Sequence, residues 1–238
     1  MKILNFYQST LGKKFVVAIT GFFMFTFVLG HMLGNLKTFG GVAKDGVHKL
    51  DHYAEFLRTI GQDFLGRETF LWGFRIALLI AVVLHIYTVV ELRKINKKAR
   101  PDSYKVQKTL SANIASKTMF FGGLTICTFI IFHVLHLTFG FFHDSFVHGR
   151  VYANVHSAFQ SPIILAIYLI TMCFLGLHLY HGLWSMFQTL GLDGKESNLY
   201  IRIFAKIFSV VVALGFVVVP LAIFLNLLPL PVAGSIIH

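Results

Sequence analysis

The chain has 238 residues, of which 56% are hydrophobic and only 13% charged, and its mean hydropathy is +0.72. This composition is typical of an integral membrane protein and excludes an ordinary water-soluble domain. The formal net charge is +11. Membrane topology and contact with anionic lipid headgroups explain this charge, so membrane lipid is an expected partner and nucleic acid is not.

Five stretches are long and apolar enough to cross a bilayer, which takes about 20 mostly apolar residues in a helix. They are apolar on all sides rather than striped, which argues against a soluble helical bundle. The stretches are residues 15–36, 70–92, 118–140, 162–188 and 204–227. We therefore predict an all-α integral membrane protein, a single membrane domain over residues 1–238 with five transmembrane helices in a bundle.

The segments around and between the spans allow further predictions. The first span follows Lys13 and Lys14 but is too long for a signal peptide and lacks a cleavage site, so we expect it to be retained. Residues 50–60 show apolar positions at helical spacing and predict an amphipathic helix at the outer interface. Pro101 breaks any helix through the basic 93–117 connection, Pro162 opens the fourth span, and Pro220 is expected to kink the fifth.

The distribution of Lys and Arg predicts the topology. Fourteen of them fall in the N-terminal segment, the 93–117 connection and the 195–206 segment, which would share one side of the membrane. The 37–69 connection has five, diluted by five acidic residues, and the 141–161 connection has only Arg150. The positive-inside rule then places the N-terminus in the cytoplasm and the C-terminus outside.

Four of the spans each contain one histidine singled out by its depth: His31, His85, His133 and His178. A histidine in hydrocarbon is costly, so each indicates a functional site. With a rise of about 1.5 Å per residue, His31 lies roughly 25 Å beyond Lys14 and His85 about 12 Å before Arg93. The same reasoning places His133 near the outer face and His178 in the inner half. The histidines therefore form an outer layer, His31 with His133, and an inner layer, His85 with His178.

Two histidines at one depth on different helices suit the two axial positions of one haem b, so two layers predict two haem b groups. Bis-histidine ligation leaves no open position on the iron and favours electron transfer. His136 and His181 follow His133 and His178 by three residues, so each is an alternative ligand or a contact for a haem propionate. Arg75 either snorkels or meets a propionate.

Other roles also fit buried histidines. They serve proton relays, metal transport and interhelical hydrogen bonds, which would make the chain a haem-free transporter or anchor. Relays and transport usually need intramembrane carboxylates, and Glu91 lies only at the edge of a span. His143, His148 and His156 belong to an outer connection expected to be solvated. Cys127 and Cys173 fit buried structural thiols, and without a CxxCH motif a covalent c-type haem is excluded.

Several segments resemble the cytochrome b558 branch of the two-haem, five-helix cytochrome b subunits of succinate:quinone oxidoreductases (succinate dehydrogenase and fumarate reductase). STLGKK at 9–14, ITG at 19–21 and GHMLGN at 30–35 resemble the family's first helix, and HLYHGLWS at 178–185 its fourth. The resemblance covers nearly the whole length. It implies haem ligation by His178 rather than His181, because Gly182 stands four residues later, and by His133 rather than His136, because Gly123 precedes it by ten.

The resemblance also implies a role. Such a subunit anchors a flavoprotein (FAD) subunit and an iron–sulfur subunit on the cytoplasmic face of the bacterial cytoplasmic membrane. It passes electrons between them and membrane quinone, here expected to be menaquinone, with no dicarboxylate chemistry in the anchor itself. Gly176 stands where some fumarate reductases of this type have a proton-transferring Glu. Outer candidates for the quinone site are Arg58, Gln62, Asp63 and Glu68. A cytochrome b561-like or hydrogenase-type cytochrome b is the alternative among redox proteins.

Overall fold

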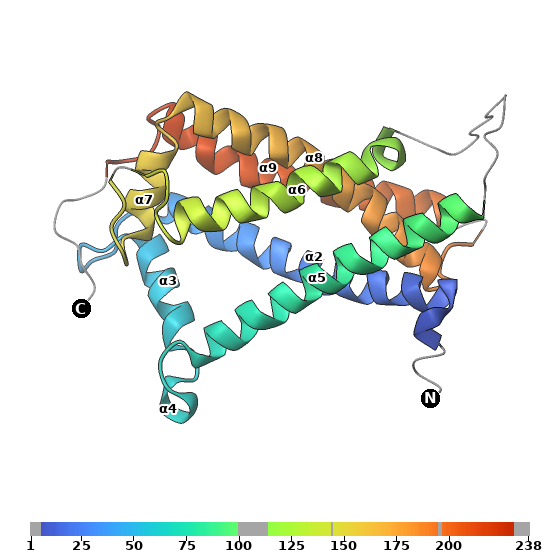
Figure 1. The fold of residues 1–238 in the computed structure, drawn as a ribbon. Coiled ribbons are helices and arrows are strands. Elements are labelled where there is room, and N and C mark those ends of the chain that lie inside the picture. Colours follow the sequence, from blue (N-terminus) through green and yellow to red (C-terminus); the bar gives the residue numbers. More distant parts are fainter. Residues whose placement is uncertain (1–5, 100–113, 144, 195–196, 231–238) are drawn as a thin grey trace.

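The structure is a computed structural model that describes residues 6–99, 114–143, 145–194 and 197–230. Within these ranges five helices are long and apolar enough to cross a membrane. They are α2 (Thr10–Asn35), α5 (Thr69–Lys98), α6 (Ile114–Leu137), α8 (Pro162–Thr189) and α9 (Ser197–Phe224), arranged as a bundle (Figure 1). The predicted all-α fold and its five spans are confirmed. Helices α2, α6 and α9 begin four to seven residues earlier than the predicted spans and end one to three residues earlier. Helix α5 continues six residues further than predicted, and α8 matches its span to within one residue.

Local sequence accounts for the helix ends. The Ser9 side chain accepts a hydrogen bond from the Gly12 N–H and caps α2, and Ser161 caps α8 in the same way through Ile164. Pro162 occupies the first turn of α8, where its missing N–H has no intrahelical partner to lose. Pro220 lies inside α9, which continues to Phe224. Pro101 lies outside the described residues.

Short helices gather at the end of the bundle opposite the N-terminus (Figure 1). They are η1 (Leu36–Gly40), α3 (Lys49–Thr59), α4 (Gln62–Leu65) and α7 (Val151–Ala158). The amphipathic helix expected at 50–60 is confirmed as α3. The expectation of a solvated 141–161 connection is wrong for its second half, because α7 buries Tyr152, Asn154 and His156 against the bundle end.

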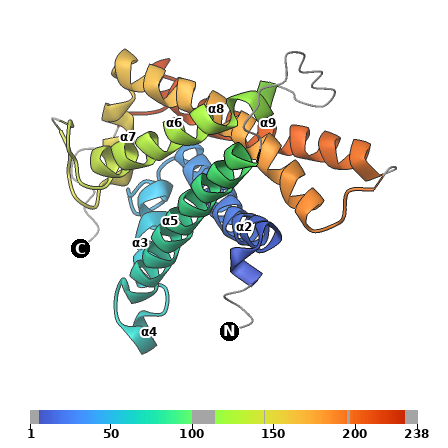
Figure 2. The ribbon, with the colours of Figure 1, turned by 45° about the vertical axis from the view of Figure 1, so that its right-hand side comes forward.

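The long helices pack as two pairs plus α9. Helix α5 packs on α2, α6 packs on α8, and α8 also packs on α9 along most of its length. Helix α2 joins the two groups through contacts with α8 and α9 (Figure 2). The apolar core lies between these three helices, for example where Met32 of α2 meets Leu179 and Val212. Helices α5 and α6 flank this core and bury few of their own side chains.

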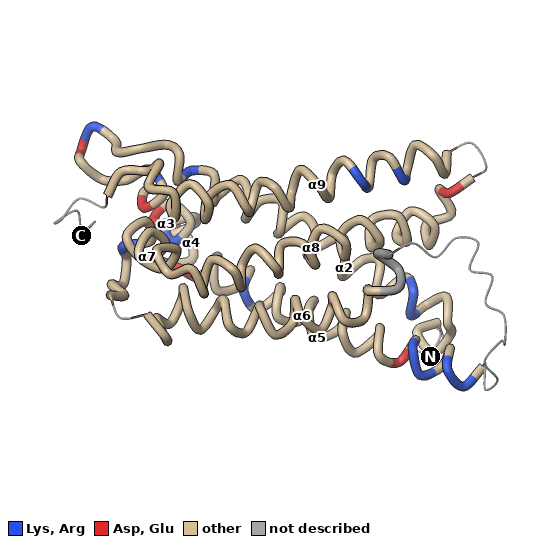
Figure 3. Tube along the Cα trace, turned by 90° about the horizontal axis from the view of Figure 1, so that it is seen from above, with Lys and Arg blue, Asp and Glu red and all other residues tan. Residues whose placement is uncertain are grey.

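Charge is unequal between the two ends of the bundle (Figure 3). The described part of the N-terminal end carries Lys and Arg from α2, α5 and α9, with only Glu91 and Asp193 as acidic residues. At the opposite end, five acidic residues between positions 45 and 68 alternate with the basic ones. This segregation is the pattern from which the cytoplasmic N-terminus is predicted.

Candidate functional site

The outer histidines come together between α2 and α6. The rings of His31 and His133 have their centroids 5.9 Å apart, at an interplanar angle of 79°. Each ring stacks on a phenylalanine four residues earlier in its own helix: Phe27 at 5.3 Å from His31, and Phe129 at 5.6 Å from His133. The helices thus present two equivalent imidazoles to each other across the bundle.

His133 is further oriented by Tyr168 of α8. Its Nδ1 lies 3.1 Å from the Tyr168 hydroxyl, and Tyr168 is itself buried against Phe159 and Phe129. A hydrogen bond at one ring nitrogen fixes the ring and directs the other nitrogen, Nε2, to a further partner. Ligand histidines are commonly held in this way.

The inner histidines each lie against a glycine of the neighbouring helix. A Cβ built on Gly21 of α2 would stand 3.4 Å from Cε1 of His85, and one built on Gly123 of α6 would stand 3.5 Å from Cε1 of His178. Among the described residues no ring contact joins His85 to His178, unlike the 5.9 Å contact of the outer pair. Because a glycine has no side chain, the His85 ring of α5 can approach the α2 backbone, and the His178 ring of α8 can approach the α6 backbone. The two distances are nearly equal.

The tautomer of His85 follows from its hydrogen bonds. The Thr20 hydroxyl donates to the Val16 carbonyl at 2.7 Å, so its oxygen accepts from His85 Nδ1 at 3.1 Å. Nδ1 therefore carries the proton, and Nε2 keeps the lone pair that a metal would use. His178 differs, since its Nδ1 is buried without a hydrogen-bond partner.

The alternative histidines face elsewhere. Among the described residues, the ring contacts of His136 are with Phe132, His143 and Tyr168, and the side chain is almost fully buried. His181 meets the edge of Trp184 at a centroid distance of 6.0 Å. Geometry therefore favours His133 over His136 as the partner of His31. The Nδ1 atoms of both His136 and His181 are buried and unpartnered.

Other predicted site residues lie apart from the histidines. Arg75 is exposed, with its guanidinium over the Trp72 ring at 4.9 Å, an arrangement that fits snorkelling. Arg58 lies 3.6 Å from Glu68 and 3.8 Å from Glu55, while Gln62 and Asp63 are exposed. Both cysteines are free thiols; Cys127 is half-buried, but Cys173 lies on the outer surface of α8, so a buried thiol was the wrong expectation there.

The histidines of the long helices offer metal donors in pairs rather than in larger clusters. Across the described residues no group of three or more His, Cys, Asp or Glu side chains is placed to hold a bare metal ion. A haem iron needs only two from the protein. His31 and His133, whose ring centroids are 5.9 Å apart, would be the two residues to supply these ligands at the outer site.

The two helix pairs repeat each other in sequence as well as in contacts. Gly21, Thr26, Phe27 and His31 of α2 have the same spacing as Gly123, Thr128, Phe129 and His133 of α6. Around the inner histidines, LHIY at 84–87 of α5 corresponds to LHLY at 177–180 of α8. The repeated spacing from glycine to histidine is visible in the sequence. Only the structure shows that each glycine contacts the histidine of the next long helix.

Comparisons of the chain with protein-family models, with curated proteins and with solved structures find no match.

Proposed function

We propose that this protein is a membrane cytochrome b that holds two haem b groups, one between His31 and His133 and one between His85 and His178. The observation that carries the proposal is the approach of His31 and His133 to 5.9 Å from two helices that share a Gly, Thr, Phe and His at the same spacing. The matched contacts of His85 with Gly21 and of His178 with Gly123 support a second site built on the same plan.

Haem held by two imidazoles would supply one-electron transfer, because the protein would leave no position on the iron open to oxygen or a substrate. The residues of the chain would bind the haem and orient its histidine ligands. Tyr168 holds the His133 ring, and Thr20 fixes the tautomer of His85 so that its Nε2 is free to act as a ligand. The apolar side chains of the spans exclude water and so favour the neutral, metal-binding form of each imidazole.

The resemblance extends the proposal to a complex. The chain would be the membrane anchor of a succinate:quinone oxidoreductase, exchanging electrons between a cytoplasmic flavoprotein and iron–sulfur pair and membrane menaquinone. The membrane would be the bacterial cytoplasmic membrane, with the N-terminus inside. The excess of basic residues at the N-terminal end supports this orientation and offers a surface for soluble partners.

A reduced-minus-oxidised spectrum of the purified protein tests the haem proposal, and a pyridine haemochrome assay counts the groups. We expect a b-type α band and two haems per chain. Absence of the band would overturn the haem proposal and leave the histidines as helix-packing residues, because the His85–Thr20 and His133–Tyr168 hydrogen bonds also join helices. Haem without a co-purifying flavin and iron–sulfur pair would instead favour a cytochrome b561-like protein.

A further inference from the structure

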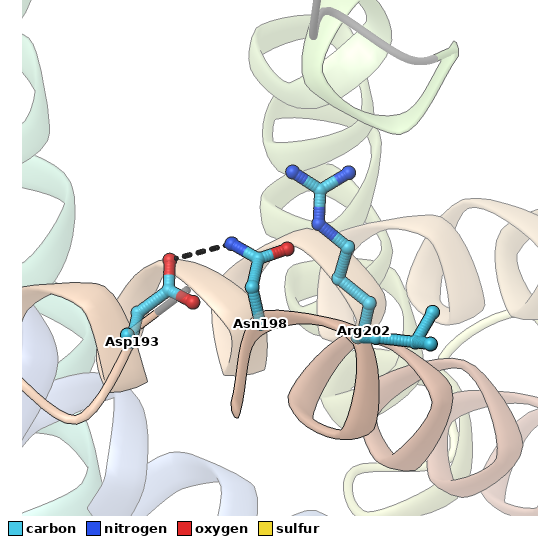
Figure 4. Close-up of a pocket in the computed structure, with 5 residues that line it drawn as sticks. Asp193, Asn198 and Arg202 are labelled. Carbon is cyan, nitrogen blue, oxygen red and sulfur yellow. Dashed lines mark hydrogen bonds between the residues drawn. The ribbon is translucent and has the colours of Figure 1, made fainter. Parts of the chain in front are cut away.

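The shallow pocket between α8 and α9 has its charged groups occupied by the protein itself. Its Asp193 accepts hydrogen bonds from Gln188 at 2.8 Å and from Asn198 at 3.0 Å (Figure 4). The guanidinium of Arg202 lies over the Trp184 ring at 4.1 Å. Packing of α8 on α9 therefore accounts for these residues. The opposite end of the bundle has exposed apolar residues for which packing within the chain does not account.

Three large apolar side chains are exposed on α3 and α4. Phe64 is 92% exposed, and Phe56 and Leu65 are each 59% exposed. Helix α4 contacts α5 and lies at a corner of the molecule, away from α8 and α9 (Figures 1 and 2). Exposure of this much apolar surface to water is unfavourable, so we expect an apolar surface outside the chain to cover it.

Ion pairs hold the polar side of the same segment. Glu55 of α3 lies 2.8 Å from Arg67 and 3.8 Å from Arg58, and Arg58 also lies 3.6 Å from Glu68. The Glu68 N–H donates to the Arg58 carbonyl at 2.7 Å. Since successive residues of a helix are about 100° apart, Phe56 is directed about 160° away from Arg58 around the α3 axis. The ion pairs thus tie α3 to the start of α5 and leave Phe56 on the other side of the helix.

The level of α4 in the membrane follows from its neighbour α5. The ion-paired Glu91 marks one boundary of the hydrocarbon, and a span of about 20 residues from there reaches back to Leu71. Trp72 stands at this second boundary with Arg75 over its ring, and Trp is enriched at the level of lipid headgroups. Helix α4 directly precedes this point in the chain, and Figure 1 shows it displaced sideways from the bundle rather than beyond its end. It therefore lies at the membrane interface.

We propose that α4 is an interfacial anchor that inserts Phe64 and Leu65 among the lipid chains of the leaflet at this end of the bundle. The apolar surface continues into the first turn of α5, where Phe70 and Trp72 are 52% and 53% exposed, which supports lipid as the occupant. Residues 49–68 carry three basic and four acidic side chains, so attraction to anionic lipid does not drive the contact. The anchor is independent of the haem proposal, because none of the candidate ligands belongs to it.

The test measures the depth of α4 in a bilayer. A nitroxide is attached to Phe64→Cys or Leu65→Cys in the full-length chain with Cys127→Ser and Cys173→Ser, reconstituted into phosphatidylcholine vesicles. Power saturation in electron paramagnetic resonance compares collisions of the label with oxygen, which enters the bilayer, and with a water-soluble nickel chelate. We expect both labels to lie about 5–10 Å inside the headgroup boundary. Asp63→Cys, an exposed position of the same short helix, is the matched control and should place its label in water.

A second measurement needs no label. Hydrogen exchange of residues 61–68 in the same vesicles should speed up when Phe64→Ser and Leu65→Ser are combined, and should not change in Gln62→Ser.

Three results would overturn the proposal. The first is a label at Phe64 that meets the nickel chelate as readily as the label at Asp63. The second is an insertion depth that requires phosphatidylglycerol or is lost in high salt, because that would make the contact electrostatic. The third is spin–spin broadening between Phe64→Cys labels on neighbouring chains, because a second copy of the chain would then cover α4 in place of lipid.

Discussion

The first helix pair, α2 with α5, and the second, α6 with α8, place equivalent residues at equivalent positions. In each pair a glycine of the first helix contacts the histidine of the second, at 3.4 Å and 3.5 Å as measured to a built Cβ. In each pair the first helix also carries a histidine stacked on a phenylalanine one turn earlier. The backbone arrangement that forms the candidate sites therefore occurs twice.

The groups that support the histidines are not repeated. His85 donates to Thr20, whereas the Nδ1 of its counterpart His178 has no partner. The first pair is also joined at its N-terminal end by Lys13, which lies 2.7 Å from Glu91, and no such ion pair joins the described parts of α6 and α8. The comparison indicates that the repeated backbone sets where a cofactor would lie, and that the surrounding side chains make its two environments different.

The largest expected effect tests whether the repeated histidines are ligands. His133→Ala and His178→Ala should each reduce the haem content from two to one per chain, measured by the pyridine haemochrome assay. The matched controls are His136→Ala and His181→Ala, which lie one turn away and should retain both haems. Retention of two haems by His133→Ala would contradict the outer assignment, and His136 would then be the candidate.

The next effect tests the ion pair between Lys13 and Glu91 that joins α2 to α5. Lys13 is 7% exposed at its side chain, and Glu91 also accepts hydrogen bonds from Tyr7 and Tyr87. Lys13→Met should lower the thermal unfolding midpoint, because it leaves the Glu91 carboxylate without its cation while conserving side-chain length. Lys14→Met, at an exposed neighbouring position, is the control. Equal midpoints for the two variants would show that the pair does not stabilise α2 against α5.

A smaller effect tests the different support of the inner histidines. Thr20→Val keeps the side-chain shape but removes the acceptor for His85 Nδ1–H, and should lower the free energy of unfolding by about 1 kcal/mol. If haem is bound, the loss of this hydrogen bond makes the imidazole less basic, so the midpoint potential of one haem should rise. Thr26→Val is the control, because the Thr26 hydroxyl donates to the Phe22 carbonyl of its own helix and lies away from His85. A redox titration in which neither haem potential moves would argue against His85 as a ligand.

Sequence alone predicted the five spans, because a uniformly apolar run of about 20 residues is characteristic of a membrane-spanning helix and rare in other structures. It also placed His31 near His133, because depth in a membrane helix follows from residue counting. It missed α7, because eight residues are too few to give a periodic signal of useful length. The roles of Thr20 and Tyr168 were equally out of reach, since each meets its histidine from a different helix, more than 30 residues away in sequence.

The weakest of the four effects concerns the junction between the two pairs, where α3 of the first connection packs on α7 of the second. His48 caps α3 through the Leu50 N–H and stacks on Tyr152 with centroids 3.6 Å apart, while Asp51 accepts a hydrogen bond from the Tyr152 N–H. Burial lowers the pKa of His48, partly opposed by the Asp51 carboxylate, and burial also lowers the pKa of His156 in α7.

Both lowered pKa values predict a loss of stability in acid. At pH values well above 6.5 the two histidines are neutral in the folded and unfolded states and contribute no pH dependence. As the pH falls below that value, the unfolded chain takes up protons that the folded chain does not, so stability decreases until the lowered pKa values are reached. The thermal midpoint should therefore fall between pH 7 and pH 5.5. His48→Asn keeps a capping acceptor without a titrating ring and should flatten this dependence, whereas His148→Asn, at an exposed position of the same end, should not. An equally steep fall in His48→Asn would show that the α3–α7 junction does not sense pH through this residue.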